Sequence, residues 1–172
     1  METQERRTRI LQILQKEQRP LSGTELAREL GVSRQIIVQD IALLRATNKN
    51  ILSTNKGYLL FQEDEEKHRF QKTVKVRHSK EETRDELYTI VDCGGRLLDV
   101  VVEHEIYGMI TVDLIINSRV DVDTFLNQVA EHETTLLNDL TKGVHFHTIE
   151  ADSMDRLDMV EAKLKEKGYL IR

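Results

Sequence analysis

The stretch Gly31-Val32-Ser33-Arg34-Gln35-Ile36-Ile37-Val38-Gln39-Asp40-Ile41-Ala42-Leu43-Leu44-Arg45-Ala46 decides the fold of the first part of the chain. Apolar residues recur at spacings of four and three, at Ile37, Ile41 and Leu44, and this spacing predicts one buried stripe on an amphipathic helix. Ser33 stands just before the helix and suits the N-cap position, because its hydroxyl can accept an orphan N–H of the first turn.

The outward side of this helix is polar and suits the DNA major groove. Arginine pairs with guanine edges there and glutamine with adenine edges, so we expect Arg34, Gln35 and Gln39 to read bases. Arg45 and, further along the chain, Lys56 are expected to hold phosphate. The predicted DNA-binding residues are Ser33, Arg34, Gln35, Gln39, Arg45 and Lys56.

A second short helix is predicted immediately upstream, from Ser22 to Leu30. Ser22 with Glu25 three residues later forms a capping box, and Gly31 suits the C′ position that ends the helix. Two short helices joined by Gly-Val-Ser form a helix-turn-helix. The alternative on this motif alone is an ordinary helical hairpin in a small core.

The flanking segments favour the DNA-binding interpretation. Ile51–Ser53 and Tyr58–Phe61 are expected to be two short strands about a Gly-containing turn, which is the wing of a winged helix, with Lys56 at its tip. The segment from Thr3 to Lys16 supplies a third core helix. Residues 1–62 are therefore predicted to be a winged helix-turn-helix domain.

The charge of the chain supports this division. The formal net charge is −5, but residues 1–62 carry ten Lys and Arg against six Asp and Glu, a net of +4, which leaves −9 for the remainder. A basic first part is expected where only one domain meets phosphates. One cysteine excludes an internal disulfide and fits a cytoplasmic protein. No apolar run approaches the length that spans a bilayer, so no membrane partner is expected.

The second domain is expected to comprise residues 63–172, after a charged connector at 62–69. It alternates strands and helices, which predicts an α+β protein whose second domain is a sandwich of helices on a mostly antiparallel sheet. The strands are expected at 73–78, 97–102, 109–116, 144–149 and 169–171. The helices are expected at 80–93, 121–133 and 153–167, the second of them capped near Asp121 or Asp123.

Histidines carry the chemistry of this domain. His145 and His147 lie two apart on a predicted strand, so both imidazoles leave the same face and offer a start for a transition-metal site. His78 closes the first strand of the domain, and Glu86 on the following helix can reach the pair. Three His and one carboxylate suit Zn²⁺ or Ni²⁺. The alternative is that His145 and His147 are solvent-facing while Phe146 fills the core.

A turn at residues 103–108 offers a second group of polar side chains. We expect His104 and Tyr107 to supply hydrogen bonds to a small anionic or aromatic ligand, and Gly108 to allow an unusual backbone angle. The alternative is a merely solvated turn histidine.

Enzyme motifs are scarce. There is no Gly-rich phosphate loop and no Gly-x-Ser-x-Gly elbow, and no residue suggests itself as a general base for a catalytic metal. We therefore expect no enzymatic activity.

Both parts of the chain resemble known domains. Gly23–Ala27 and Val32–Ile41 resemble the helix-turn-helix of the biotin-repressor type. His78, Val102–Gly108 and Gly143–Thr148 resemble the 3H domain, whose fold is described as an HPr-like α/β sandwich. The combination resembles the niacin-responsive transcriptional repressors of the NiaR/YrxA family.

This resemblance implies a function and a ligand set. Members of that family bind operator DNA as homodimers and repress genes for NAD synthesis or niacin uptake when nicotinic acid, the co-repressor, is present. The resemblance also implies a metal held by His78, Glu86, His145 and His147. We then expect nicotinic acid to complete the coordination of the metal while His104 and Tyr107 orient its ring.

The sequence leaves two other classes of function possible. One is a metal-dependent enzyme acting on a pyridine compound, fused to a DNA-binding module. The other is a purely structural 3H domain that dimerises the protein and whose metal serves only the fold.

Overall fold

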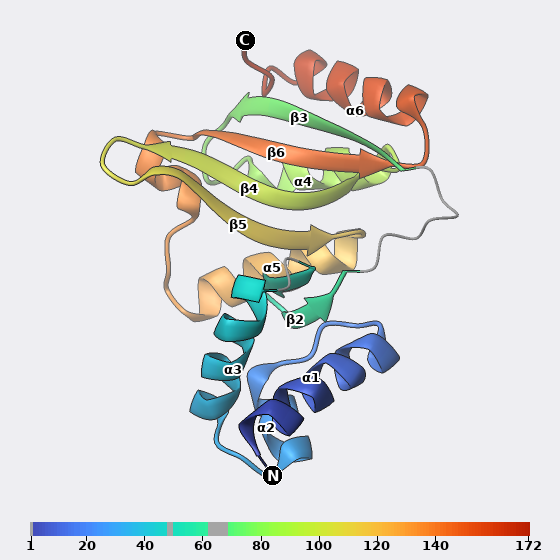
Figure 1. The fold of residues 1–172 in the computed structure, drawn as a ribbon. Coiled ribbons are helices and arrows are strands. Elements are labelled where there is room, and N and C mark those ends of the chain that lie inside the picture. Colours follow the sequence, from blue (N-terminus) through green and yellow to red (C-terminus); the bar gives the residue numbers. More distant parts are fainter. Residues whose placement is uncertain (1, 48–49, 62–68) are drawn as a thin grey trace. The chain divides into compact units, whose positions relative to one another are not determined.

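The computed structural model describes residues 2–47, 50–61 and 69–172. The chain forms two compact units, Met1–Asp64 and Glu65–Arg172, each with its own hydrophobic core (Figure 1). The charged connector expected at 62–69, including His68, lies outside the described residues except for Arg69.

The first unit is a winged helix-turn-helix. It contains α1 (Thr3–Glu17), α2 (Gly23–Leu30) and α3 (Arg34–Thr47), followed by the antiparallel hairpin of β1 (Ile51–Thr54) and β2 (Gly57–Leu60). Ser22 accepts from the Glu25 N–H and Glu25 accepts from the Ser22 N–H, so the predicted capping box is present. Gly31 ends α2 in the left-handed conformation at φ 65°.

Apolar side chains from all three helices and β1 form the core of this unit. The residues that are buried almost completely are Ile10, Leu14, Leu26, Ile37, Ile41 and Ile51. The wing is tied to the helices by backbone hydrogen bonds between Leu21 and Tyr58 in both directions, each 2.8 Å. Gly57 permits this approach, because a Cβ there would lie 2.4 Å from the Leu21 carbonyl oxygen.

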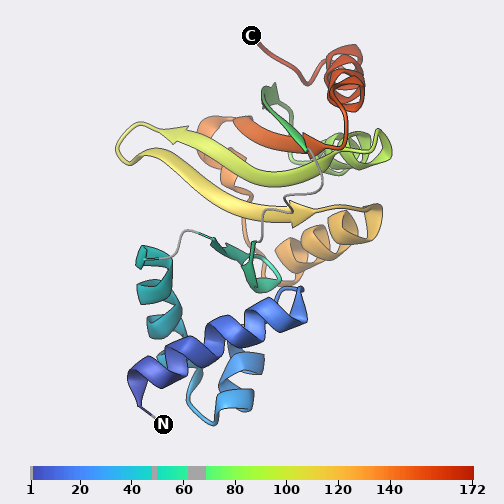
Figure 2. The ribbon, with the colours of Figure 1, turned by 45° about the vertical axis from the view of Figure 1, so that its right-hand side comes forward.

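The second unit is a four-stranded antiparallel sheet with the strand order β3-β6-β4-β5. Its strands are β3 (Phe70–Arg77), β4 (Arg96–His104), β5 (Gly108–Ile116) and β6 (Val144–Ala151). The β4–β5 hairpin projects past the rest of the sheet (Figure 2), and β5 forms one edge.

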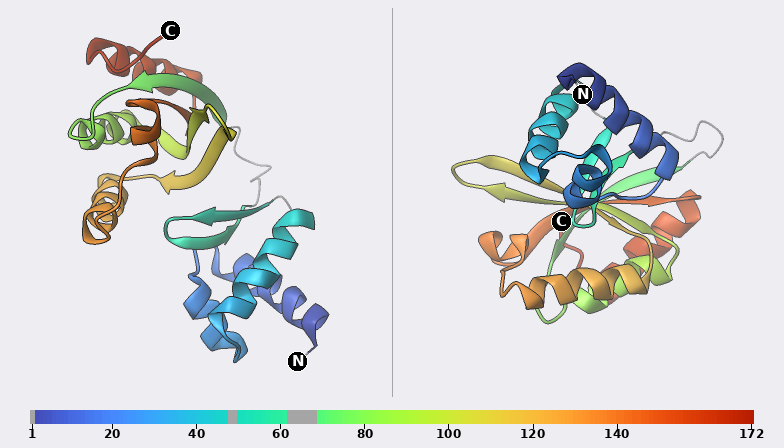
Figure 3. Two further views of the ribbon diagram at one scale, coloured as in Figure 1. Left: turned by 90° about the vertical axis from the view of Figure 1, so that its left-hand side faces the viewer. Right: turned by 90° about the horizontal axis from the view of Figure 1, so that it is seen from below.

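Three helices cover one face of this sheet: α4 (Thr83–Asp92), α5 (Arg119–Glu131) and α6 (Met154–Glu166) (Figure 3, left). The core lies between the two layers and contains Leu87, Ile90, Val122, Leu157 and Leu164 from the helices. The predicted α+β class with an α/β sandwich as the second domain is therefore confirmed.

Two local expectations in the second unit were wrong, and one element was not predicted. The helix expected from Asp121 begins two residues earlier, because Ser118 is the N-cap and Asp121 instead accepts from the Asn117 N–H. The strand expected at 169–171 is reduced to one bridge between Val76 and Leu170. A short 3₁₀ helix, η1 (Leu137–Thr141), was not predicted.

Candidate functional site

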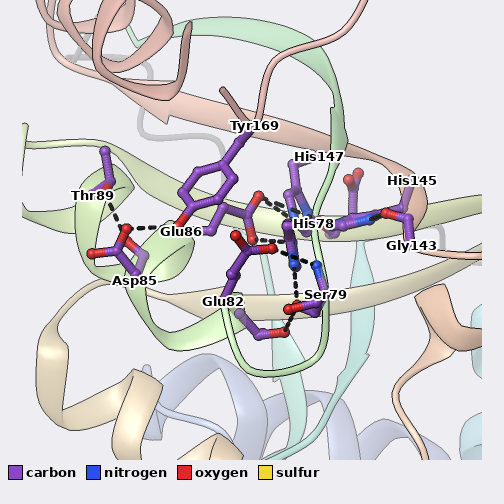
Figure 4. Close-up of polar contacts among 12 residues, drawn as sticks. His78, Ser79, Glu82, Asp85, Glu86, Thr89, Gly143, His145, His147 and Tyr169 are labelled. Carbon is purple, nitrogen blue, oxygen red and sulfur yellow. Dashed lines mark hydrogen bonds and ion pairs between the residues drawn. The ribbon is translucent and has the colours of Figure 1, made fainter. Parts of the chain in front are cut away.

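Four side chains from three elements converge on the helix-covered face of the sheet in the second unit (Figure 4). His145 and His147 leave β6, His78 directly follows β3, and Glu86 lies in the first turn of α4. All four are buried, and the Glu86 side chain is fully so. The structure thus brings together the four residues predicted to hold a metal.

The side-chain atoms of the cluster are close enough to share one ligand. The Nε2 atoms of His145 and His147 lie 3.0 Å apart. One Glu86 oxygen lies 3.2 Å from His147 Nε2 and 4.0 Å from His145 Nε2, and the other lies 2.9 Å from His78 Nε2.

The second nitrogen of each ring fixes which atom points inward. Each Nδ1 faces a backbone carbonyl oxygen: His78 faces Ser79 at 2.8 Å, His145 faces Gly143 at 2.9 Å and His147 faces Asp99 at 2.7 Å. A carbonyl oxygen only accepts, so Nδ1 carries the proton and the lone pair of each neutral ring is on Nε2. Three lone pairs and a carboxylate therefore point at the same volume.

Two backbone features build these acceptor positions. β4 carries an extra residue between Leu97 and Val101 relative to β6, and at this bulge the Asp99 carbonyl turns to the His147 ring. Bulges re-aim groups in this way beside functional sites. Gly143 has φ 86°, and a Cβ there would lie 2.4 Å from the His78 carbonyl oxygen. Only glycine allows the strand ends to approach this closely.

The buried ionisable groups of the cluster shift one another's pKa values. Burial opposes the ionisation of Glu86, but His147 and His78 outweigh it, so the pKa of the carboxyl lies below its usual value. Burial opposes the charged form of His78 and His147, yet Glu86 holds the pKa of both above 6.5. Burial and the nearby His147 lower the pKa of His145 to about 4.

The donor set is that of a transition-metal site. Imidazole nitrogens and a carboxylate are the ligands that Zn²⁺ and similar transition-metal ions accept. A carbonyl oxygen that accepts the Nδ1 proton of each imidazole is the usual support for such ligands. His78 Nε2 and both Glu86 oxygens are buried without a hydrogen-bond partner among the described residues. Buried polar atoms of this kind need a partner, and a cation would satisfy them.

A cavity of about 210 Å³ opens beside the cluster. Apart from the four cluster residues its walls are largely apolar: Leu87, Val100, Val112, Leu114, Phe125, Val129, Leu136 and Leu137. Apolar walls with a few convergent polar groups are typical of a small-molecule site. The cavity is large enough for a single six-membered ring with one substituent.

The other predicted site lies on α3 of the first unit. Ser33 accepts from the Ile36 N–H and caps the helix as expected. Arg34, Gln35 and Gln39 are exposed on the side opposite the buried stripe. Asp40, on the inner side, is buried and accepts from Arg6 at 2.6 Å and Arg7 at 2.9 Å, which fixes α3 to α1.

Comparison with known proteins decides the family. A helix-turn-helix domain model matches residues 6–59, and the 3H domain model matches residues 71–172. A protein of Thermotoga maritima named "Probable transcription repressor NiaR" is 43% identical over 168 residues, which cover 98% of this chain and 94% of that protein. The chain belongs to the NiaR-type transcription repressors.

A second relative agrees with this assignment. The "Transcription repressor NadR" of Bacillus subtilis is 38% identical to this NiaR-type repressor over 168 residues, which cover 97% of the chain and 93% of the relative. An uncharacterized protein of Methanothermus fervidus is 34% identical over 115 residues, 58% of the chain but 17% of its own length. In the part of the repressor that is described, no helix has the length and apolarity required to cross a membrane.

Some predicted site residues of the repressor lie elsewhere. His104 and Tyr107 are at the β4–β5 turn and do not line the cavity beside the metal cluster. His104 Nδ1 instead accepts from the N–H groups of Ile106 and Tyr107, at 3.2 and 3.3 Å, so the ring orders the turn.

The two residues expected to hold phosphate lie in the first unit. Arg45 donates from Nε to the Ile51 carbonyl at 3.2 Å. Lys56 lies in the wing turn between β1 and β2.

The alternative in which His145 and His147 face solvent was wrong. Both are buried on the helix-covered face, whereas Phe146 points to the other face beneath the Lys75 ammonium. The sequence pattern predicted no role for Asp99, for Asp40 or for the residues that form the cavity walls. The one sequence signal available for Asp40 was its position among Ile37, Ile41 and Leu44 on the buried side of α3.

Proposed function

We propose that this chain represses genes of NAD synthesis or niacin uptake, acting in the cytoplasm as a homodimer on operator DNA with nicotinic acid as co-repressor. The observation that carries the effector part of the proposal is the apolar cavity that opens onto His78, Glu86, His145 and His147. The resemblance to niacin-responsive repressors and the names of the two full-length relatives support the regulatory part.

DNA contact is assigned to the exposed side of α3 and to the wing. Arg34, Gln35 and Gln39 would meet base edges, since their side chains lie on the side of the helix that the core leaves free. Ser33 at the helix N-terminus and Lys56 in the wing turn would meet the phosphate backbone. Arg45, in the last turn of α3, would meet phosphate.

A divalent transition metal, Zn²⁺ or Ni²⁺, would be held by the three Nε2 atoms and the Glu86 carboxylate. When bound, it supplies an electrophilic centre that accepts a carboxylate or a ring nitrogen. The chain contributes the fixed donors, because the carbonyls of Ser79, Gly143 and Asp99 hold the three rings with Nε2 inward.

Nicotinic acid matches the remaining chemistry of the cavity. It has one aromatic ring, a carboxylate and a pyridine nitrogen, so its polar groups would face the cluster while its ring contacts Val100, Leu114 and Phe125. His104 and Tyr107 line no part of this cavity. They would contact the nicotinic acid ring only if a second copy of the chain brought them to it.

The effect on DNA follows from differential affinity. A dimer presents two copies of α3, which must be separated by about one DNA turn to enter successive major grooves. Nicotinic acid would act as a co-repressor if it binds more tightly to the dimer arrangement with that separation.

An enzymatic role has no support from the cavity. Among the described residues, Glu86 is the only carboxylate that lines it, and Glu86 belongs with the three histidines to the proposed metal donor set.

The test is fluorescence anisotropy of an operator fragment with the full chain, as purified and after removal of metal with a chelator. Nicotinic acid should raise the DNA affinity of the metal-loaded protein and leave that of the stripped protein unchanged, and re-addition of the metal should restore the response. Nicotinamide, which lacks the carboxylate, is the matched control ligand. DNA affinity that responds to neither nicotinic acid nor metal would contradict the proposed co-repressor mechanism.

A further inference from the structure

A buried tyrosine that is not one of the four proposed metal ligands lies beside them. Tyr169 follows α6 and is 7% exposed. Its N–H donates to the Leu164 carbonyl at 2.9 Å, and its carbonyl accepts from the Arg77 N–H at 2.8 Å. The backbone of Tyr169 is therefore fixed both to α6 and to the end of β3, which leaves its side chain little freedom of position.

The Tyr169 side chain contacts one proposed ligand directly and the chain neighbour of another (Figure 4). Its ring meets the His78 ring edge-on, with the ring centroids 5.7 Å apart. Its hydroxyl donates to an Asp85 carboxylate oxygen at 2.8 Å. Asp85 immediately precedes Glu86 in the first turn of α4. One side chain thus joins the two segments that carry His78 and Glu86.

The first turn of α4 needs a contact of this kind. Among the described residues, its N-cap residue Glu82 makes no side-chain capping bond, and an uncapped helix start is less stable. Asp85 also accepts from Lys167, at 2.8 and 2.9 Å, but both side chains of this ion pair are more than one third exposed, so it contributes little. Tyr169 is the more effective restraint, because its buried ring and fixed backbone keep the hydroxyl in one place.

We propose that Tyr169 is a positioning residue of the metal site: its hydroxyl, through Asp85, holds the start of α4 where the Glu86 carboxylate meets His78. This inference rests on the metal site of the proposed function and adds a residue to it. A Glu86 oxygen lies 2.9 Å from His78 Nε2, so a small shift of the helix start changes the separation of two donors. Loss of a group that orients metal ligands typically lowers metal affinity by about 10–100-fold.

Tyr169→Phe in the full chain tests the role of the hydroxyl, because it keeps the ring against His78. The affinity for Zn²⁺, measured by competition with a chelator, should fall roughly tenfold. Co²⁺ is the second probe, since its visible absorption reports the geometry of its ligands. The spectrum of the Co²⁺-loaded variant should differ from that of the unmodified chain.

Tyr88→Phe is the matched control on α4. The Tyr88 hydroxyl donates to Asp123 at 2.7 Å, so this variant also loses one hydrogen bond from a tyrosine to an aspartate. It should keep the Zn²⁺ affinity and the Co²⁺ spectrum of the unmodified chain. Urea unfolding of both variants without metal compares their stabilities. An equal loss of Zn²⁺ affinity in the two variants would overturn the specific role of Tyr169.

Asp85→Asn separates position from charge. The asparagine still offers an oxygen to the Tyr169 hydroxyl but carries no negative charge, so the Zn²⁺ affinity should stay close to that of the unmodified chain. A loss as large as that in Tyr169→Phe would mean that the charge of Asp85 acts on the site, which would overturn the proposal.

The unmodified chain distinguishes two failures. If it binds no Zn²⁺, the proposed metal site is wrong and the positioning role falls with it. If it binds Zn²⁺, and Tyr169→Phe lowers stability but changes neither the affinity nor the spectrum, Tyr169 supports only the fold. That result would overturn this inference and leave the metal site standing.

Discussion

The Nε2 atoms of His145 and His147 lie 3.0 Å apart, while their Nδ1 atoms face the Gly143 and Asp99 carbonyls. Two ring nitrogens with lone pairs repel at this distance unless a proton or a cation lies between them. Glu86 adds negative charge at the same point, which favours a cation.

Loss of one ring should therefore empty the proposed metal site. His147→Ala should reduce the metal content of the purified chain from about one ion to near zero, because the ion would lose one of its four donors. Metal content is measured by inductively coupled plasma mass spectrometry. His104→Ala, which removes an imidazole outside the cluster, should keep the full metal content, and an equal loss in both variants would contradict the assignment.

Acidification should release the metal. The three rings bind metal only when Nε2 is unprotonated. Since Glu86 holds the pKa of His78 and His147 above 6.5, proton competition begins at a higher pH than for a free imidazole. Metal affinity, measured by competition with a chelator at about pH 8, 7 and 6, should fall by up to tenfold per pH unit for each proton displaced. Affinity that does not change over this range would argue against histidine ligands.

Filling the cavity should separate effector binding from metal binding. Val129→Phe places a ring in the space lined by Leu114 and Phe125, so nicotinic acid should no longer change DNA affinity while metal content stays normal. Calorimetric titration with nicotinic acid gives the direct measurement. Ala130→Phe, at the adjacent exposed position of α5, is the matched control and should retain the response.

A base-reading role of Arg34 predicts a selective loss of DNA affinity. Arg34→Ala should weaken operator binding by about 1–3 kcal/mol and relax specificity at one base pair. Anisotropy with operator and scrambled fragments measures both effects, and Lys163→Ala in the second unit is the control. Unchanged affinity for both fragments would show that α3 docks differently.

The buried Asp40 should contribute to the stability of the first unit. Asp40→Ala leaves Arg6 and Arg7 without their shared acceptor, and we expect a loss of about 2–4 kcal/mol in the free energy of unfolding. The bonds from both arginines outweigh burial and hold the pKa of this carboxyl below its usual value. Its contribution is thus present above the pKa of the unfolded chain and is lost as pH falls through the folded value. Urea unfolding at neutral and acidic pH measures it, and equal stability of variant and parent at neutral pH would refute it.

Local patterns were sufficient to predict the first unit. The Ser22–Glu25 capping box, Gly31 and the stripe of Ile37, Ile41 and Leu44 each act within one or two turns of helix, so the sequence determines them directly. The His-x-His spacing likewise determined that His145 and His147 share a face of β6.

Only the tertiary structure decided that this face of β6 is the buried one and which groups contact the two imidazoles. Burial of the two rings, the approach of Glu86 on α4 and the turn of the Asp99 carbonyl at the β4 bulge all depend on pairing between segments distant in sequence. No local periodicity encodes these contacts. The cavity is likewise a product of the tertiary structure, because its walls come from α4, α5, residues 134–138 and three strands.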